Sequence, residues 1–226
     1  METFEVHVPQ AAIDDLHSRL RAIRWPGRET VADDSQGVPL ARARMLADHW
    51  LHRHDWRAFE RRINRHPQYH VAIDGLMIHF IHVRSPHPGA IPLLLTHGWP
   101  GSVVEFLDCI GPLTDPVAHG GSAGDAFDVV IPSIPGFGFS GQPTSTGWNA
   151  ERTARAWGVL MKALGYTRWF AQGGDWGSLI THRLAQLRPQ GLAAAHVNLP
   201  LVFPKEAPTK PAPGETRALE RLASVV

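Results

Sequence analysis

An aspartate framed by glycines is the residue best suited to do chemistry in this chain. Asp175 lies between Gly173 and Gly177, and a short apolar run, residues 169–171, precedes it. Apolar residues then recur at helical spacing over residues 179–187. The pattern G-x-D-x-G therefore predicts a sharp turn from a strand into a helix, where a Cβ at either flanking glycine would collide with the neighbouring strand or helix.

A carboxylate at the tip of such a turn favours one kind of chemistry. It needs no base to activate it, and it can displace a leaving group from a saturated carbon to form an ester that water then hydrolyses at the carboxyl carbon. Asp175 therefore points to substrates with an electrophilic sp3 carbon, such as epoxides or alkyl halides. The alternative is a glycine-rich turn in which Asp175 only caps the following helix.

A second motif could supply the hydrogen-bond donors that this chemistry needs. When water attacks the ester, backbone N–H groups must stabilise the negative oxygen that develops. One donor would be the N–H of Trp176, directly after the nucleophile. The other would be the N–H of Trp99, because the run His97 to Gly101 follows the apolar segment 91–95. The alternative for this run is an ordinary tight turn with a packed tryptophan.

The elements that must position these residues alternate between strands and helices. The expected strands are residues 69–73, 76–83, 91–95, 127–131, 169–171 and 193–198. The expected helices between them are residues 103–113, 150–164 and 179–187. The pair Asp74-Gly75 predicts a two-residue hairpin between the first two strands. Such alternation predicts a mainly parallel sheet with helices on both faces.

Two of these helices begin with cap signals. Ser102 and Glu105, three residues apart, predict a capping box, and the helix that follows should be interrupted or end near Pro112. Asn149 predicts the N-cap of the helix over residues 150–164.

Three amphipathic helices are expected before any strand. Apolar residues recur at helical spacing over residues 9–23, 40–50 and 56–63. Because their apolar stripes need a partner, we expect residues 1–66 to form a helical arm that packs on a body formed later in the chain.

Composition limits the class of protein. The 226 residues are 43% hydrophobic, which is enough for a substantial core in one domain or slightly more. Lys and Arg (22) balance Asp and Glu (21), so no nucleic-acid partner is expected. The single cysteine, Cys109, excludes an internal disulfide and is expected to be a small buried residue. The N-terminus lacks a signal sequence and no run approaches a membrane span, so the default expectation is an unanchored cytoplasmic protein.

Two other residue clusters are expected to be structural. The three histidines within residues 49–54 lack a cysteine or carboxylate at a recognisable ligand spacing, so no metal site is expected. Trp148, Trp157 and Trp169 could bind substrate, but packing is the expected role.

Together the motifs resemble those of the microsomal-type epoxide hydrolases, which have the α/β-hydrolase fold. The resembling stretches are residues 24–26, 54–57, 73–75, 97–102, 132–140 and 173–178. They span nearly the whole chain, and the helical N-terminal arm is typical of that family. The resemblance implies three parts: the arm (1–66), the N-terminal part of an α/β-hydrolase core (67–203) and the start of a lid (204–226).

The resemblance implies an enzyme that opens a small epoxide to a vicinal diol without a cofactor. Asp175 would form a hydroxyalkyl ester, and the N–H groups of Trp99 and Trp176 would form the oxyanion hole. A histidine supported by a carboxylate would activate water, and paired lid tyrosines would protonate the epoxide oxygen. Phe137 and Phe139, near a motif loop, are candidates to wall a substrate pocket together with the two tryptophans.

One part of the family pattern is missing. The acid and the histidine follow the nucleophile in this fold, but only His182 and His196 follow Asp175. We expect His182 to be structural, and His196, within a predicted core strand, to be a structural histidine in the core or at the edge of the sheet. The only tyrosines, Tyr69 and Tyr166, precede the lid. The chain stops in apolar positions of an unfinished helix, so a truncated form with little or no turnover is expected.

Two other functions stay open from the sequence. A haloalkane dehalogenase could use the same Asp175, with halide bound by Trp99 and Trp176, although the arm and the Gly173-Gly174 pair favour an epoxide hydrolase. A non-catalytic remnant or interaction module is the other alternative. An incomplete sheet would expose an unpaired edge, so self-association through that edge is expected as well.

Overall fold

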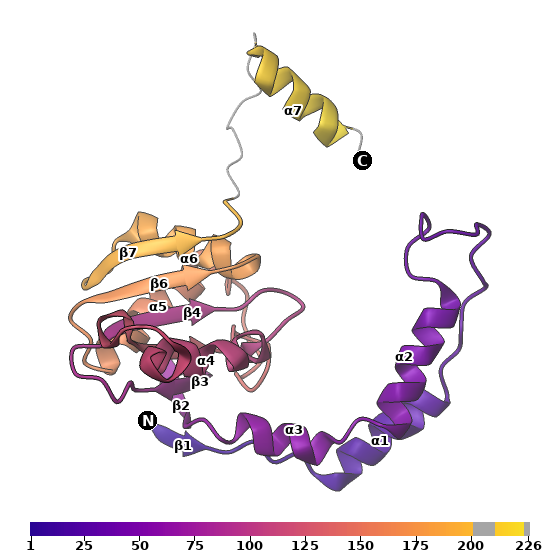
Figure 1. Cartoon of the computed structure of the whole chain (residues 1–226), viewed down its shortest axis with the longest axis horizontal. Coiled ribbons are helices and arrows are strands. Elements are labelled where there is room, and N and C mark those ends of the chain that lie inside the picture. The colour runs from indigo at the N-terminus through magenta and orange to yellow at the C-terminus, as the bar shows by residue number, and fades with distance from the viewer. Residues whose placement is uncertain (201–210, 224–226) are drawn as a thin grey trace.

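Seven strands form one mixed sheet in the computed structural model, which describes residues 1–200 and 211–223 (Figure 1). The strands are β1 (Glu2–Phe4), β2 (Gln68–Ile73), β3 (Leu76–Val83), β4 (Ile91–Thr96), β5 (Phe127–Pro132), β6 (Trp169–Gly173) and β7 (Leu192–Val197). Their order is β1-β2-β3-β5-β4-β6-β7. The pairs from β1 to β5 are antiparallel, and β5, β4, β6 and β7 run parallel. The predicted nucleophile therefore follows a strand of the parallel part.

Helices lie on both sides of this sheet, as predicted. They are α1 (Gln10–Arg21), α2 (Leu40–His52), α3 (Trp56–Ile63), α4 (Leu107–Thr114), α5 (Ala150–Ala163), α6 (Trp176–Leu187) and α7 (Pro213–Ala223), with the 3-10 turns η1 (Val103–Phe106), η2 (Pro116–His119) and η3 (Ala123–Asp125). In Figure 1, α4 lies in front of the sheet and α5 and α6 lie behind it. The helix predicted over residues 103–113 instead begins as a 3-10 turn and continues through Pro112. The proline removes only the bond to the carbonyl of Asp108, an exposed residue.

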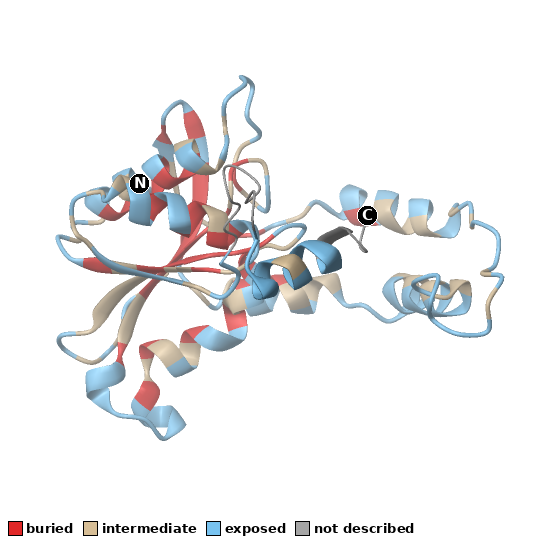
Figure 2. Cartoon of the chain, turned by 90° about the horizontal axis from the view of Figure 1, so that it is seen from above, coloured by how far each residue is buried: buried red, intermediate tan, exposed pale blue. Residues whose placement is uncertain are grey.

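Side chains alternate between two cores along the central strands. Leu94 packs with residues of α5 and α6, whereas its neighbour Leu95 packs with residues of α3 and α4. The same alternation separates Phe80 from Ile81 on β3. Figure 2 shows that buried residues are concentrated on the sheet and on the helix faces that meet it. The double burial fixes the register of the strands that end at the site, because a slip of one residue would exchange the two faces.

The hairpin and the cap of α5 form as predicted. Asp74 and Gly75 both have positive φ, 52° and 76°, which a type I′ turn requires. Asn149 Oδ1 accepts the N–H of Arg152 at 3.0 Å and so caps α5.

The N-terminal arm differs from the prediction in two ways. First, β1 precedes the helices and pairs with β2 as an outer strand of the sheet. Second, only α3 packs on the sheet, through the fully buried Ile63, while α1 and α2 extend away from it (Figures 1 and 2). No residue of α2 is buried, and Leu46 and Trp50 are 57% and 45% exposed. The apolar stripe of α2 is therefore only partly covered within the described residues.

Two polar side chains fasten α3 to the segment after β1. The carboxylate of Glu60 accepts the N–H of Val8 at 2.6 Å and also bonds the side chains of Trp56 and Arg57. The amide of Asn64 both accepts from and donates to the backbone of Val6. The motif over residues 54–57 thus has a structural role here.

The other end of the sheet is an open edge. β7 pairs with β6, and no further strand covers it within the described residues. His196 is exposed on this strand, so of the two predicted places it has the one at the edge, and the expectation that this strand is a core strand is wrong within the described sheet. Cys109 is likewise exposed, on α4, and not buried as predicted. Self-association through the edge of β7 stays a prediction.

The C-terminal predictions are covered only in part. Residues 201–210, which include most of the proline-rich segment, and residues 224–226 lie outside the described residues. Of the predicted start of a lid over 204–226, the structure describes α7 with the two residues before it. No described helix has both the length and the apolar character needed to cross a membrane.

A buried histidine connects β3 to the loop that follows β5. His79 Nδ1 lies 2.9 Å from Ser133 Oγ, and its Nε2 lies 3.0 Å from Gln68 Oε1. The ring is fully buried, and this burial, helped by the nearby His70, lowers its pKa from 6.5 to about 3. The unfolded chain therefore binds a proton at His79 at pH values where the folded chain does not.

We expect the free energy of unfolding to fall as the pH drops below about 6.5, with a contribution from His79 that approaches about 1.4 kcal/mol per pH unit. Urea unfolding between pH of about 7 and about 5 measures this slope. His79→Gln keeps a hydrogen-bonding side chain that does not titrate, so its slope should be shallower. His182→Gln, at an exposed position of α6, controls for the loss of a surface histidine. Equal slopes for wild type and His79→Gln would contradict the assignment.

Candidate active site

The predicted turn around Asp175 forms where β6 ends and α6 begins. Asp175 has a φ of 53° and a ψ of −123°, a backbone conformation that residues other than glycine rarely adopt. A Cβ at Gly173 would collide with the carbonyl of Gly177, and a Cβ at Gly177 would collide with the carbonyl of Thr96 at the end of β4. Both glycines are therefore required because α6 packs directly against the ends of β6 and β4.

The carboxylate of Asp175 points at the loop after β4. Its Oδ1 accepts the backbone N–H of Trp99 at 2.8 Å. The side chain makes no N-cap bond to α6, so the capping alternative is not the role seen here. None of the ion pairs in the described part of the chain involves Asp175. The N–H groups of Trp99 and Trp176 lower the pKa of the Asp175 carboxyl, so it is ionised at neutral pH.

The loop after β4 is held by the side chain of Glu105. Both carboxylate oxygens of Glu105 accept the N–H of Gly98, at 3.3 and 3.2 Å. The predicted capping box is therefore only partly formed. Ser102 Oγ accepts the N–H of Val104 at 3.4 Å and so caps the turn, but the carboxylate of Glu105 binds the N–H of Gly98 in the loop and not the N–H of Ser102. Gly101 permits this path, because a Cβ there would occupy the place of the Glu105 carboxylate.

Gly98 lets the loop approach the nucleophile. A Cβ built on Gly98 would lie 2.8 Å from Asp175 Cβ and 3.0 Å from Asp175 Oδ1. Any other residue would therefore push the loop or the carboxylate out of place.

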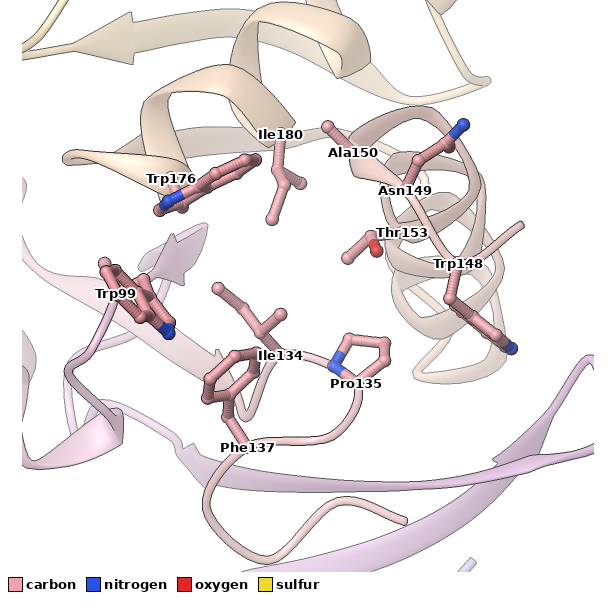
Figure 3. A pocket seen from close by; sticks show the side chains of 11 residues that line it. Trp99, Ile134, Pro135, Phe137, Trp148, Asn149, Ala150, Thr153, Trp176 and Ile180 are labelled. Atoms are coloured by element: carbon pink, nitrogen blue, oxygen red, sulfur yellow. The ribbon is translucent and has the colours of Figure 1, made fainter. Parts of the chain in front are cut away.

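An apolar cavity of about 350 Å³ lies beside the loop and the turn that hold this carboxylate, although Asp175 itself is not among the residues that line it (Figure 3). It is lined by Gly98, Trp99, Ile134, Pro135, Phe137, Trp148, Asn149, Ala150, Thr153, Trp176 and Ile180. In Figure 3 the indoles of Trp99 and Trp176 lie at one end and Trp148 lies at the opposite end. Because Trp99 and Trp176 are 58% and 49% exposed, the cavity is open to solvent at the end near the nucleophile.

Three of the four residues predicted to line the pocket do so. Trp99, Trp176 and Phe137 contribute to the cavity wall, but Phe139 does not. Phe139 instead packs against Phe4 and His79 on the other side of the loop. Gly138 between the two phenylalanines has a φ of 55° and reverses the chain, so their side chains diverge.

Several pocket residues were not predicted. Ile180 lies four residues after Trp176 on α6, and this same-face helical spacing from a predicted pocket residue is a signal that could have identified it. Trp148 lines the pocket, whereas Trp157 and Trp169 are fully buried in the core as predicted. The position of Trp148 just before the cap of α5 carries no such signal.

The remaining chemical candidates lie elsewhere. His182 and His196 are exposed on α6 and β7, and neither lines the cavity. Tyr69 stacks on Phe80, and the hydroxyl of Tyr166 donates to Asp128 at 3.1 Å. Within residues 1–200 and 211–223, no group of three or more histidine, cysteine or acidic side chains could hold a metal ion.

Comparison with known protein families assigns both parts of the chain. The family described as "Epoxide hydrolase N terminus" matches residues 1–106, and the family described as "alpha/beta hydrolase fold" matches residues 91–220. The two matches meet at the loop that carries Trp99. They confirm the predicted fold class.

Individual relatives agree with this assignment. A Stigmatella aurantiaca protein provisionally named as an epoxide hydrolase is 59% identical over 96% of this chain and 49% of its own length. Epoxide hydrolase 1 of Oryctolagus cuniculus is 39% identical over 88% of this chain and 45% of its own length. The chain thus spans about half the length of these relatives.

A solved structure extends the likeness to three dimensions. The Aspergillus niger epoxide hydrolase superposes with a TM-score of 0.80 at 32% identity, over 99% of this chain and 59% of that one. On these matches, the chain belongs to the microsomal-type epoxide hydrolase family, which has the α/β-hydrolase fold.

Proposed function

We propose that the described residues carry the nucleophilic site of an epoxide hydrolase that acts on apolar epoxides. One observation carries the proposal: the carboxylate of Asp175, on a strained turn, accepts the N–H of Trp99 at 2.8 Å, and Trp99 and Trp176 on either side of it line an apolar cavity. A structural aspartate at this place would cap α6, and Asp175 does not.

The first step would be attack on the substrate. A carboxylate oxygen of Asp175 forms a bond to one epoxide carbon, the bond from that carbon to the epoxide oxygen breaks, and the oxygen takes up a proton from water. The product is a hydroxyalkyl ester of Asp175. The N–H of Trp99 supports this step by holding the carboxylate in one orientation, and the side chains of Ile134, Phe137 and Ile180 would hold the apolar part of the substrate.

The second step would release a vicinal diol. Water adds to the ester carbonyl, and the negative charge develops on the carbonyl oxygen. The N–H of Trp99 already binds this carboxyl group, and the N–H of Trp176, next in the chain, would join it in stabilising the charge before the ester bond breaks and the Asp175 carboxylate returns.

We further propose that this chain alone turns over slowly or not at all. Water activation needs a base close to the ester, and the described residues that line the cavity include neither a histidine nor a tyrosine. In the family pattern a histidine supported by a carboxylate supplies the base, and tyrosines supply the acid. The alkylated enzyme should therefore accumulate, which makes the nucleophile directly observable.

Mass spectrometry after incubation with styrene oxide tests the nucleophile. We expect one hydroxyalkyl adduct, and peptide mapping should place it on Asp175. Asp175→Asn should abolish the adduct, because an amide is a far weaker nucleophile. Asp125→Asn is the control, since Asp125 is an exposed aspartate on η3 that does not line the cavity.

The outcomes separate the proposal from its alternatives. An adduct that persists in Asp175→Asn, or no adduct on a folded wild-type chain, contradicts the proposal and favours an interaction module. Halide release from a short haloalkane without alkylation by the epoxide would favour a dehalogenase.

The close approach of Gly98 generates a second test. Gly98→Ala should slow alkylation of Asp175 by roughly 10- to 100-fold, because the added Cβ displaces the Trp99 donor or the carboxylate. Gly27→Ala is the control, since no atom lies within 4 Å of its added Cβ. The time course of adduct mass measures both rates, and circular dichroism checks the fold. A folded Gly98→Ala variant that reacts at the wild-type rate would refute the requirement for close approach.

A further inference from the structure

We propose that His97 is a positioning residue for the oxyanion hole: its Nδ1–H fixes the peptide group whose N–H, from Trp99, binds Asp175. This inference rests on the proposed function of Asp175 and adds to it the device that keeps the donor in place. His97 makes no contact with the carboxylate that the structure records, so it acts through the peptide between Gly98 and Trp99.

The hydrogen bonds of the ring determine its tautomer. His97 is fully buried; its Nδ1 lies 2.8 Å from the carbonyl oxygen of Gly98, and its Nε2 lies 3.0 Å from the backbone nitrogen of Ile134. Because the N–H of Ile134 can only donate, Nε2 must accept, and the ring proton must reside on Nδ1. Burial also lowers the pKa of His97, which keeps the ring in this neutral form at neutral pH.

The peptide between Gly98 and Trp99 transmits the constraint. Its carbonyl accepts from His97, and its N–H donates to Asp175 Oδ1. Because a peptide group is planar, a bond that fixes the carbonyl also fixes the direction of the N–H. The two hydrogen bonds also polarise the same group in the same sense, so each strengthens the other. A glycine at position 98 would otherwise allow this peptide to rotate.

The same ring joins the donor to the substrate pocket. Ile134, which donates to His97, belongs to the loop after β5 and lines the cavity (Figure 3). One side chain therefore sets the distance between the oxyanion hole and an apolar wall of the pocket. Thr153 and Ile180 line other parts of that cavity and have no such link to the loop after β4 among the recorded hydrogen bonds of the described residues.

Two substitutions separate the two bonds of His97. In His97→Asn the side-chain NH2 can occupy the place of Nδ1 and donate to Gly98, while the acceptor for Ile134 is lost. In His97→Gln the side-chain oxygen can occupy the place of Nε2 and accept from Ile134, while the donor to Gly98 is lost. Each variant loses one buried hydrogen bond, so similar losses of thermal stability are expected.

Two quantities are measured. The first is the pKa of Asp175, obtained by monitoring the 13C resonance of its carboxyl carbon as the pH is changed. The second is the rate of alkylation by styrene oxide. We expect His97→Gln to raise the pKa of Asp175 toward the ordinary aspartate value and to slow alkylation by about tenfold, the factor that one hydrogen bond of ordinary net strength produces. His97→Asn should leave both quantities close to those of the wild type.

The proposal is overturned if the pKa of Asp175 is unchanged in His97→Gln. It is also overturned if both variants change this pKa equally, because that result indicates a purely structural role for His97. Should neither variant fold, the 15N shifts of His97 in the wild type decide, because a proton on Nε2 would refute the assigned tautomer. A wild-type chain that is not alkylated would contradict the proposed function, but the titrations would still test the role of His97.

Discussion

The hydrogen bond between the N–H of Trp99 and Asp175 Oδ1 is the interaction on which the site depends. It joins residues that are 76 positions apart in the chain. It can form because β4 and β6 are parallel neighbours with Thr96 beside Gly173, so both strands end at the same level of the sheet. Parallel strands place the loops that follow them at one edge, which is where ligands bind in sheets of this kind.

The rest of the described fold serves to bring three segments close together at that edge. Glycines at 98, 173 and 177 remove the side chains that would separate the loop after β4, the turn after β6 and the start of α6. Glu105 holds that loop from one side through the N–H of Gly98. The strained backbone of Asp175 persists because the packing of α6 on the sheet, through Ile180 in the buried core, determines it.

The sequence allowed β2 to β7, the turn at Asp175 and the donor at Trp99 to be predicted, since each has a local signal: short apolar runs, flanking glycines and a short motif. The short β1 was not predicted. Features that depend on tertiary packing could not be predicted. The carboxylate of Glu105 looks like half of a capping box until the loop that it binds is placed beside it. Phe139 diverges from Phe137 because of the backbone conformation of Gly138, which the sequence does not specify. The arm was predicted as helical, but how far α1 and α2 extend from the sheet depends on contacts beyond their own pattern.

The most direct test is a crystal structure of the chain after reaction with styrene oxide. If the central hydrogen bond is the basis of the site, Asp175 should carry a hydroxyalkyl ester. The ester carbonyl oxygen should lie within hydrogen-bonding distance of the backbone nitrogens of Trp99 and Trp176, and the phenyl group should occupy the cavity beside Phe137. A free Asp175 carboxylate with the ester on another residue, or an Asp175 ester whose carbonyl points away from both nitrogens, would contradict the account.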